Sequence, residues 1–397
     1  MRQTKTGRTV RGAAASFMIA LGSLAIAGVA HAEDAPALKL TGSYKADIAA
    51  TVSGGQAKRG RVLDDFQIFG DLDLDKAMGW KGATAHFQLL NNSGAEPNGD
   101  AGTLQGVDNI EVARQRARLF EAWVEQGFGD KGSVRAGLYD LNSEFYSNES
   151  AGMLLAPAFG IGSELAATGP NGPSIFPSTS LAVRVRWTPN EHVYAQAAAL
   201  NANAGVLGDP GGIKTSFDNG LLLIAEAGWT GRGKVACGTW RYTKKQDDIR
   251  VIAAGGDAAP AVANGAYLLL ERKLTKGGED APRQTTAFAR LGVSDGDTTA
   301  FRGGWQAGMM VKHVFASRPD SAFSVGVDQA LLSRKYRDNA LDDGQRLKTS
   351  ERAIEITYAD KIGPVTIQPD IQYVKDPGAD GGVGHALVAI VRFGVTF

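Results

Sequence analysis

The chain ends with HALVAIVRFGVTF (residues 385–397), and side chains of two kinds alternate along this stretch. One face carries Leu387, Ala389, Val391, Phe393, Val395 and Phe397. The other face includes Arg392 and Thr396. Alternation with period two indicates a β-strand. A soluble antiparallel sheet turns its apolar face inward, whereas a transmembrane barrel turns it outward to lipid and its polar face to water. The rest of the chain must decide between these arrangements.

The first 32 residues have the organisation of a secretory signal peptide. Four cations within the first eleven residues precede an apolar stretch at 17–30, and Ala30-His31-Ala32 is a small-residue cleavage pattern. The apolar stretch is short and rich in Gly and Ala, which argues against a membrane anchor. We therefore predict cleavage after Ala32, leaving one exported domain at 33–397.

The composition of the mature chain excludes several classes of protein. Without the four cations of the leader, 38 Lys and Arg face 42 Asp and Glu, a net charge of −4. A nucleic-acid binder normally has a strongly basic face, so we expect no nucleic-acid partner. The single cysteine, Cys237, excludes an intramolecular disulfide. No later stretch has the roughly 18 apolar residues of a membrane helix.

Strand-like runs bounded by Gly, Asp, Asn and Pro recur through the mature chain. We predict sixteen strands, at 38–52, 62–75, 80–90, 116–127, 132–139, 180–188, 191–200, 219–230, 233–242, 264–274, 284–293, 303–316, 321–332, 351–360, 363–374 and 384–397. Their lengths are near or above the roughly 9–11 residues of a tilted membrane strand, and bacterial barrels have even strand numbers. Pro369 inside one run predicts a bulge, because proline removes a ladder donor.

The connections are sorted by length. Links after even-numbered strands are short, such as TPNE and TGRG, whereas most links after odd-numbered strands are longer. The longer links are 91–115, 140–179, 201–218, 243–263 and 333–350. Short periplasmic turns opposite long extracellular loops are typical of outer-membrane barrels.

The run SLAVRVRW (180–187) shows which face meets water. Leu181, Val183, Val185 and Trp187 share one face, and Arg184 and Arg186 lie on the other. A lipid-facing arginine near the bilayer midplane would cost roughly 2–4 kcal/mol, so the arginines face the lumen. The same reasoning places these charged side chains inside: Glu226, Arg290, Asp328, Glu355, Asp370 and Arg392. We therefore predict an all-β, transmembrane antiparallel outer-membrane β-barrel of about 16 strands.

The longest connection, residues 140–179, follows the fifth predicted strand. Loops of this length in a compact domain are usually functional. We expect it to fold into the lumen as a constriction.

Several segments together resemble the OprB-type carbohydrate-selective porins. They are VDNIEV (107–112), LFEAWVEQGFGDKGSVRAGLYDLNSEF (119–145), FPSTSLAVRVRW (176–187), EAGW (226–229) and IQPDIQYVKDPG (367–378). The resemblance implies a passive or weakly selective channel for small sugars such as glucose, with a constricted eyelet, in a Gram-negative outer membrane. The C-terminal Phe397 resembles the signal read by outer-membrane assembly machinery. A homotrimer is one candidate assembly, and lipid is the surrounding partner.

Sugar selection suits the polar residues predicted to line this channel. Arginine and carboxylate side chains can hydrogen-bond vicinal hydroxyls, and an aromatic ring can stack on a pyranose. The wall candidates are Arg118, Arg135, Arg184, Arg186, Glu226, Arg290 and Arg392. The candidates at the root of the long loop are Tyr139, Asp140, Asn142, Glu144 and Phe145. The alternative is that these groups only solvate the wall and brace the loop.

Rival functions are distinguished by charge and by histidine placement. Six wall arginines could serve an anion, phosphate or dicarboxylate channel, although the inward carboxylates oppose a purely cationic tube. A barrel enzyme needs a His-containing pair at one rim, and the histidines are sparse and dispersed. We therefore predict no enzyme, no cofactor and no metal site. A soluble exported sugar-binding β-protein would not sort its loops by length.

Overall fold

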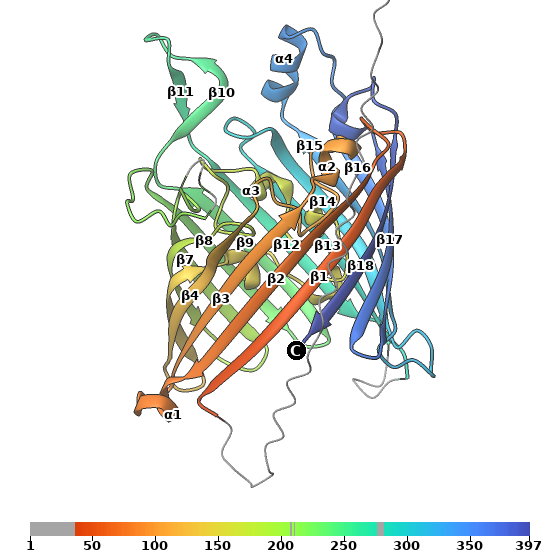
Figure 1. Cartoon of the computed structure of the whole chain (residues 1–397). Helices are drawn as coiled ribbons and strands as arrows, with labels where there is room; N and C mark the ends of the chain where they lie inside the picture. Colours follow the sequence, from red (N-terminus) through yellow and green to blue (C-terminus); the bar gives the residue numbers. More distant parts are fainter. Residues whose placement is uncertain (1–35, 207–208, 210, 276–281) are drawn as a thin grey trace, which may run out of the picture. The chain divides into compact units, whose positions relative to one another are not determined.

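Neighbouring strands pair edge to edge until the sheet closes on itself (Figure 1). The computed structural model describes residues 36–206, 209, 211–275 and 282–397. Within these residues sixteen antiparallel strands form the barrel, and β1 closes it by pairing with both β2 and β18. The barrel strands are β1 (Leu38–Ser53), β2 (Gly60–Asp73), β3 (Ala83–Gly94), β4 (Arg116–Gly127), β5 (Gly132–Tyr139), β6 (Ser180–Trp187), β7 (Val193–Asn201), β8 (Leu221–Thr230), β9 (Gly233–Tyr242), β12 (Asn264–Lys273), β13 (Gln284–Ser294), β14 (Phe301–Lys312), β15 (Ala322–Leu332), β16 (Ser350–Ile362), β17 (Val365–Lys375) and β18 (Ala386–Thr396).

The remaining elements lie in the connections. A two-stranded hairpin is formed by β10 (Gln246–Ile252) and β11 (Ala258–Ala261). The α-helices are α1 (Leu74–Met78), α2 (Pro97–Ala101), α3 (Ser163–Ala166) and α4 (Arg334–Asp342). Single 3-10 turns occupy Leu141–Ser143, Glu149–Ala151, Pro157–Phe159 and Pro377–Ala379. Over the described part of the chain, no helix is long and apolar enough to cross a membrane.

The two faces of the strands differ as their sequences predict. On β6, Val183 and Val185 are each 49% exposed on the outside, whereas Arg184 between them is 1% exposed. The outward positions of the other strands carry exposed apolar side chains such as Leu268, Ile356 and Ile371. An apolar exterior with polar groups inside is the arrangement of a lipid-embedded barrel.

All sixteen predicted strands are confirmed, and the ends of most differ by a few residues from the predicted bounds. The bulge predicted at Pro369 is wrong, because Pro369 stands opposite Val391 in unbroken register. Its carbonyl points to β16, where it accepts a hydrogen bond from Thr357 Oγ1 (3.2 Å). The missing N–H therefore falls on the β16 side, where the ladder skips Tyr358 and Ala359 without a register shift. The predicted signal peptide (1–32) lies outside the described residues.

The long connections gather at one end of the barrel. Figure 1 shows the β10–β11 hairpin and α4 at the upper end, and α1 at the lower end. The hairpin docks on α4 through Arg250, whose Nη1 donates to Asn339 Oδ1 and Asp342 Oδ2 (both 2.7 Å). Nothing in the sequence of 243–263 or 333–350 indicated these two elements.

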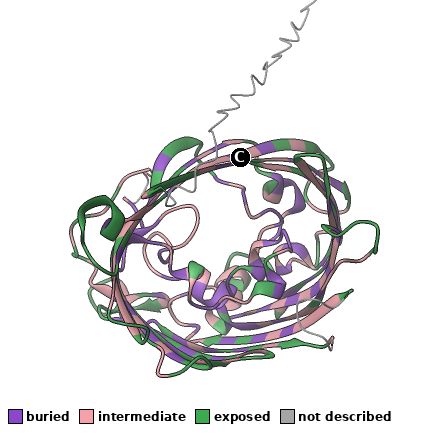
Figure 2. Cartoon of the chain, turned by 90° about the horizontal axis from the view of Figure 1, so that it is seen from below, coloured by how far each residue is buried: buried purple, intermediate pink, exposed green. Residues whose placement is uncertain are grey.

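Two connections fold inward and fill part of the lumen. Inner loop A is residues 95–115, between β3 and β4, and inner loop B is residues 140–179, between β5 and β6. Figure 2, along the barrel, shows segments with buried residues inside the ring of strands. Val107 and Ile110 of inner loop A pack with Leu155 of inner loop B against inward residues of β18. Apolar packing therefore fixes both loops inside the barrel.

Candidate functional site

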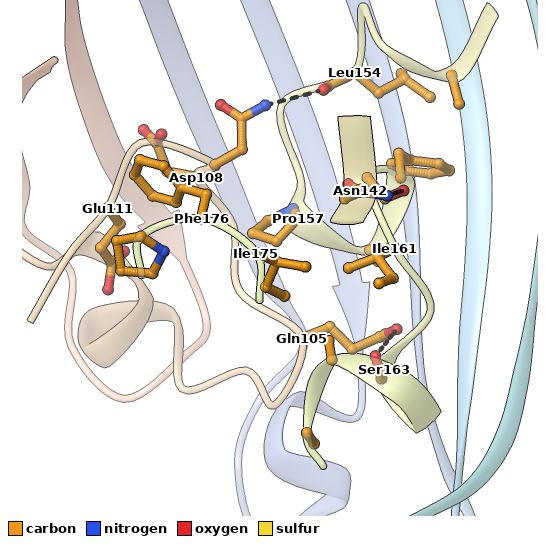
Figure 3. Close-up of a pocket in the computed structure, with 18 of the residues that line it drawn as sticks. Gln105, Asp108, Glu111, Asn142, Leu154, Pro157, Ile161, Ser163, Ile175 and Phe176 are labelled. Carbon is orange, nitrogen blue, oxygen red and sulfur yellow. Dashed lines mark hydrogen bonds between the residues drawn. The ribbon is translucent and has the colours of Figure 1, made fainter. Parts of the chain in front are cut away.

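A cavity of about 520 Å³ lies where the two inner loops meet in the lumen (Figure 3). Inner loop A contributes side chains from 104–111, and inner loop B contributes side chains from 140–177. Ser163 Oγ donates to Gln105 Oε1 (3.2 Å), and Asn109 Nδ2 donates to the Leu154 carbonyl (3.5 Å), so hydrogen bonds join the loops. The cavity is therefore built jointly by both loops.

Carboxylates of the barrel wall hold the inner loops by their backbone N–H groups. Glu226 accepts from Tyr146 N (3.0 Å), and Glu271 accepts from Ser150 N (3.0 Å). Glu355 accepts from the backbone N–H groups of both Leu155 and Ala156. Glu351 does the same for inner loop A, with Leu104 N at 2.8 Å and Gln105 N at 3.1 Å. Backbone N–H groups in loops have no strand or helix partner, so they need such acceptors when they are buried.

The root of inner loop B is tied to the wall by a network of arginines and carboxylates. Arg184 donates to Glu144 (2.8 and 3.0 Å), to Glu125 (3.0 Å) and to Ser133 Oγ (2.7 Å). Arg135 donates to Glu125 (2.6 and 2.8 Å) and lies 3.7 Å from the centre of the Trp123 ring. The Tyr139 hydroxyl donates to Glu144 (2.5 Å). These charges neutralise one another, so most of the network is structural.

Arg186 differs from its neighbour on the same face. Its side chain is 35% exposed, donates to Gln196 Oε1 (3.0 Å) and lies 5.1 Å from the ring of Tyr194. The nearest carboxylate oxygen, on Glu144, is 3.8 Å away. Arg186 therefore keeps donor capacity toward the lumen.

The other predicted residues are separated from one another. Arg118 donates to the Pro177 carbonyl (2.9 Å), and Arg392 donates to Asp47 (2.6 Å) and Asp108 (3.2 Å). Phe145 is buried in an apolar cluster. Of the twelve predicted residues, Asp140 and Asn142 line the cavity in the described structure.

Five polar side chains at the cavity were missed, because they lie in loops without periodicity. They are Gln105, Asp108, Asn109 and Glu111 of inner loop A, and Ser163 of inner loop B. A usable signal was the segment VDNIEV inside the long 91–115 connection, since it puts several polar groups in a second long loop at the same end of the barrel.

The ionisable groups that line the cavity are acidic. They are Asp108, Glu111 and Asp140, and no Lys, Arg or His lines it among the described residues. Burial raises the pKa of Glu111 to about 7. Burial and the charge of Glu121 raise the pKa of Asp140 to about 8. Burial and the neighbouring Asp47 also raise the pKa of Asp108, against the opposing charge of Arg392. The cavity thus becomes more negative as pH rises through these values.

Comparison with known proteins gives consistent matches. The family described as "Carbohydrate-selective porin, OprB family" matches residues 57–397. "Porin B" of Pseudomonas aeruginosa is 25% identical over 89% of this chain and 86% of that protein. "Putative porin QuiX" of Acinetobacter baylyi is 21% identical over 90% and 89%. The high-pH structure of Pseudomonas putida OprB superposes with a TM-score of 0.80 at 23% identity, covering 91% of this chain and 94% of that one.

Proposed function

The chain belongs to the OprB family of carbohydrate-selective porins, and from that membership we propose that small neutral sugars, monosaccharides such as glucose, diffuse passively through the cavity between inner loops A and B. The family and the barrel support a channel in the outer membrane. The cavity itself carries the proposal. Its volume of about 520 Å³ is within the roughly 300–1,000 Å³ of small-molecule sites.

The side chains of the cavity suit a sugar that is polar at its edge and apolar on its faces. The carboxylates and the amides of Gln105, Asn109 and Asn142 supply acceptors and donors for hydroxyl groups. Phe176, Ile161 and Pro157 supply apolar surface in the same cavity. A conducting pore must also release its substrate, and separate polar contacts without a closed pocket allow that.

We assign the wall arginines to two roles. Arg186, which keeps exposed donors, contacts the passing sugar directly. Arg184 and Arg135, with Tyr139 and Glu144, hold the root of inner loop B and act on selection through the loop. Arg118, Arg290 and Arg392 hold the loops by bonds to carbonyl or carboxylate oxygens, and Glu226 and Phe145 anchor the start of inner loop B.

The acidic cavity weighs against a channel for anions. A phosphate or a dicarboxylate would pass three carboxyl groups, with Arg392 contacting one of them, Asp108, from the wall. Like charges in a narrow, partly dry site repel strongly. We therefore propose that, as the pH rises through about 7 and about 8 and Glu111 and Asp140 become charged, anions pass more slowly than neutral sugars of equal size.

Deleting residues 150–170 tests whether inner loop B forms the constriction. Liposomes containing the deletion variant should swell faster in glucose and admit larger sugars than the parent channel. A matched deletion of 247–259 shortens the β10–β11 hairpin at the same end of the barrel, outside the cavity lining, and should change neither.

A filling variant covers the case in which the deletion disturbs folding. Ala167 is an exposed residue of the cavity lining, so Ala167→Trp should reduce glucose flux without disturbing packing. Unchanged swelling in both folded variants would place the constriction elsewhere.

A further inference from the structure

A strip of the barrel wall opposite the root of inner loop B is shaped to receive that loop. Arg290 of β13 is buried and donates to three loop carbonyls, Ala158 (2.9 Å), Gly160 (3.0 Å) and Tyr146 (3.3 Å). Within 4.0 Å it has no carboxylate partner in the described structure. A buried guanidinium that donates its hydrogen bonds to one loop specifies where that loop lies.

Beside Arg290, two facing positions of the wall are glycines. Gly292 of β13 stands opposite Gly304 of β14 in the barrel register. A Cβ atom at Gly292 would lie 1.7 Å from Glu164 Oε1 and 2.5 Å from the Tyr146 hydroxyl. The Tyr146 hydroxyl donates to that same Glu164 oxygen (2.7 Å). The Glu164–Tyr146 pair therefore occupies a socket that exists because residue 292 has no side chain.

A third glycine extends the socket. A Cβ atom at Gly326 of β15 would lie 2.6 Å from both Leu154 Cδ1 and Phe159 Cε1. Three neighbouring strands thus present glycines where inner loop B touches them. None of these three glycines has a positive φ, so the backbone conformation does not require glycine there. Close approach of the loop is the remaining reason for Gly292 and Gly326, whereas a Cβ atom at Gly304 would first meet the Gln329 carbonyl oxygen of the wall (2.9 Å) and lie 3.6 Å from Glu164 Oε2.

We propose that Arg290 and the glycine socket at Gly292 and Gly326 are positioning elements that set the width of the constriction. Ala158, Gly160 and Ser163 line the cavity, and two of them are also bound through their carbonyls by Arg290. The contacts of inner loop B with the wall therefore determine the position of the residues that it presents to the cavity. This inference rests on the proposed function, because it takes inner loop B as the narrow part of the channel.

The proposal predicts opposite effects for two variants. In Gly292→Ala the added methyl carbon would lie 1.7 Å from Glu164 Oε1, whereas ordinary van der Waals contact begins at 3.4 Å. Glu164 is buried, so the added methyl group displaces α3 toward the lumen, and single-channel conductance should fall. Arg290→Ala removes the three carbonyl contacts, so conductance should rise and disaccharides should enter more readily.

Rescue and control variants separate positioning from damage to the barrel. Gly292→Ala combined with Glu164→Ala and Tyr146→Phe removes both oxygen atoms that the methyl group would meet, at 1.7 and 2.5 Å, and should restore the parent conductance. Gly394→Ala on β18 is the matched control, because the nearest atom to its Cβ would be 3.9 Å away. Each variant is first checked for the mobility shift between unboiled and boiled protein on a gel.

Two results would overturn the proposal. One is parent conductance in folded Gly292→Ala and Arg290→Ala channels, and the other is failure of Glu164→Ala with Tyr146→Phe to rescue Gly292→Ala. Failure of the proposed function looks different, since the 150–170 deletion would then also leave conductance unchanged.

Discussion

Replacing Arg184 by alanine separates a bracing arginine from a sugar-binding one. Arg184 is 1% exposed and makes four hydrogen bonds, to Glu144, Glu125 and Ser133. Its removal leaves Glu125 and Glu144, both largely buried, with Arg135 as the cation that they share and Arg186 at 3.8 Å from Glu144. We expect the Arg184→Ala barrel to be less stable, with an open root of inner loop B.

The magnitude follows from the burial of the pair. Removing one partner of a buried ion pair costs about 3–5 kcal/mol when the other charge stays buried without compensation. Arg135 still pairs with both carboxylates, so we expect the lower end of this range for Arg184→Ala. Arg186 is more exposed and lies 3.8 Å from Glu144, so Arg186→Ala should cost at most about 1 kcal/mol. Sugar affinity should respond in the reverse order. The loss of one charge-assisted bond at Arg186 is worth about 1.5 kcal/mol in a wet pore, roughly a tenfold weaker block by glucose.

Urea unfolding in detergent and glucose block of the ion current measure the two effects. A double-mutant cycle with Glu144→Gln adds a direct check, because removing the stranded charge should recover part of the stability lost in Arg184→Ala. If Arg184→Ala keeps the parent unfolding free energy but loses glucose block, Arg184 binds the sugar and the bracing role is refuted.

Other predictions address the cavity charge, the loop anchor and the outer wall. Raising the pH through about 7 and about 8 charges Glu111 and Asp140, so the reversal potential in a KCl gradient should shift toward cations across this window; a flat profile would exclude these groups from the ion path. Glu226→Gln should lower the melting temperature and increase current noise, because Glu226 accepts from Tyr146 N, Tyr194 OH (2.7 Å) and Tyr267 OH (2.8 Å). Each hydrogen bond to the charged carboxylate contributes about 1.5–3 kcal/mol. A melting temperature equal to that of the parent would contradict the anchoring role. Cys237 faces outward, so a membrane-impermeant thiol reagent should label it slowly in proteoliposomes and rapidly after denaturation, whereas rapid labelling of the intact barrel would place it in water.

The barrel could be predicted from sequence because a charged side chain that faces lipid destabilises the fold. Because side chains alternate with period two, each residue of a strand faces either the lipid or the lumen. Arg184, between Val183 and Val185, shows which face of its strand is the polar one. The β10–β11 hairpin and α4 were not predicted, because short elements held by contacts between loops leave no periodic signal. Cys237 was ambiguous in sequence, and the structure places it outward with Val235.

The site was harder to predict, because facing does not say what covers a residue. Arg290 and Glu355 do point inward, yet inner loop B covers both. A sequence shows a polar lumen residue in the same way whether it meets water or a loop carbonyl. The cavity residues Asp108 and Glu111 lie in a loop whose path depends on contacts far along the chain, such as Arg392 with Asp108. The role of Gly292 likewise depends on Glu164, which is distant in sequence.

Liposome swelling with glucose and gluconate, two solutes of similar size that differ in charge, tests the central claim most directly. A carbohydrate channel whose narrow part is acidic should admit glucose clearly faster than gluconate at pH 8, and the difference should shrink at pH 6. Equal rates at both pH values, or faster entry of gluconate, would contradict a sugar channel selected at this cavity.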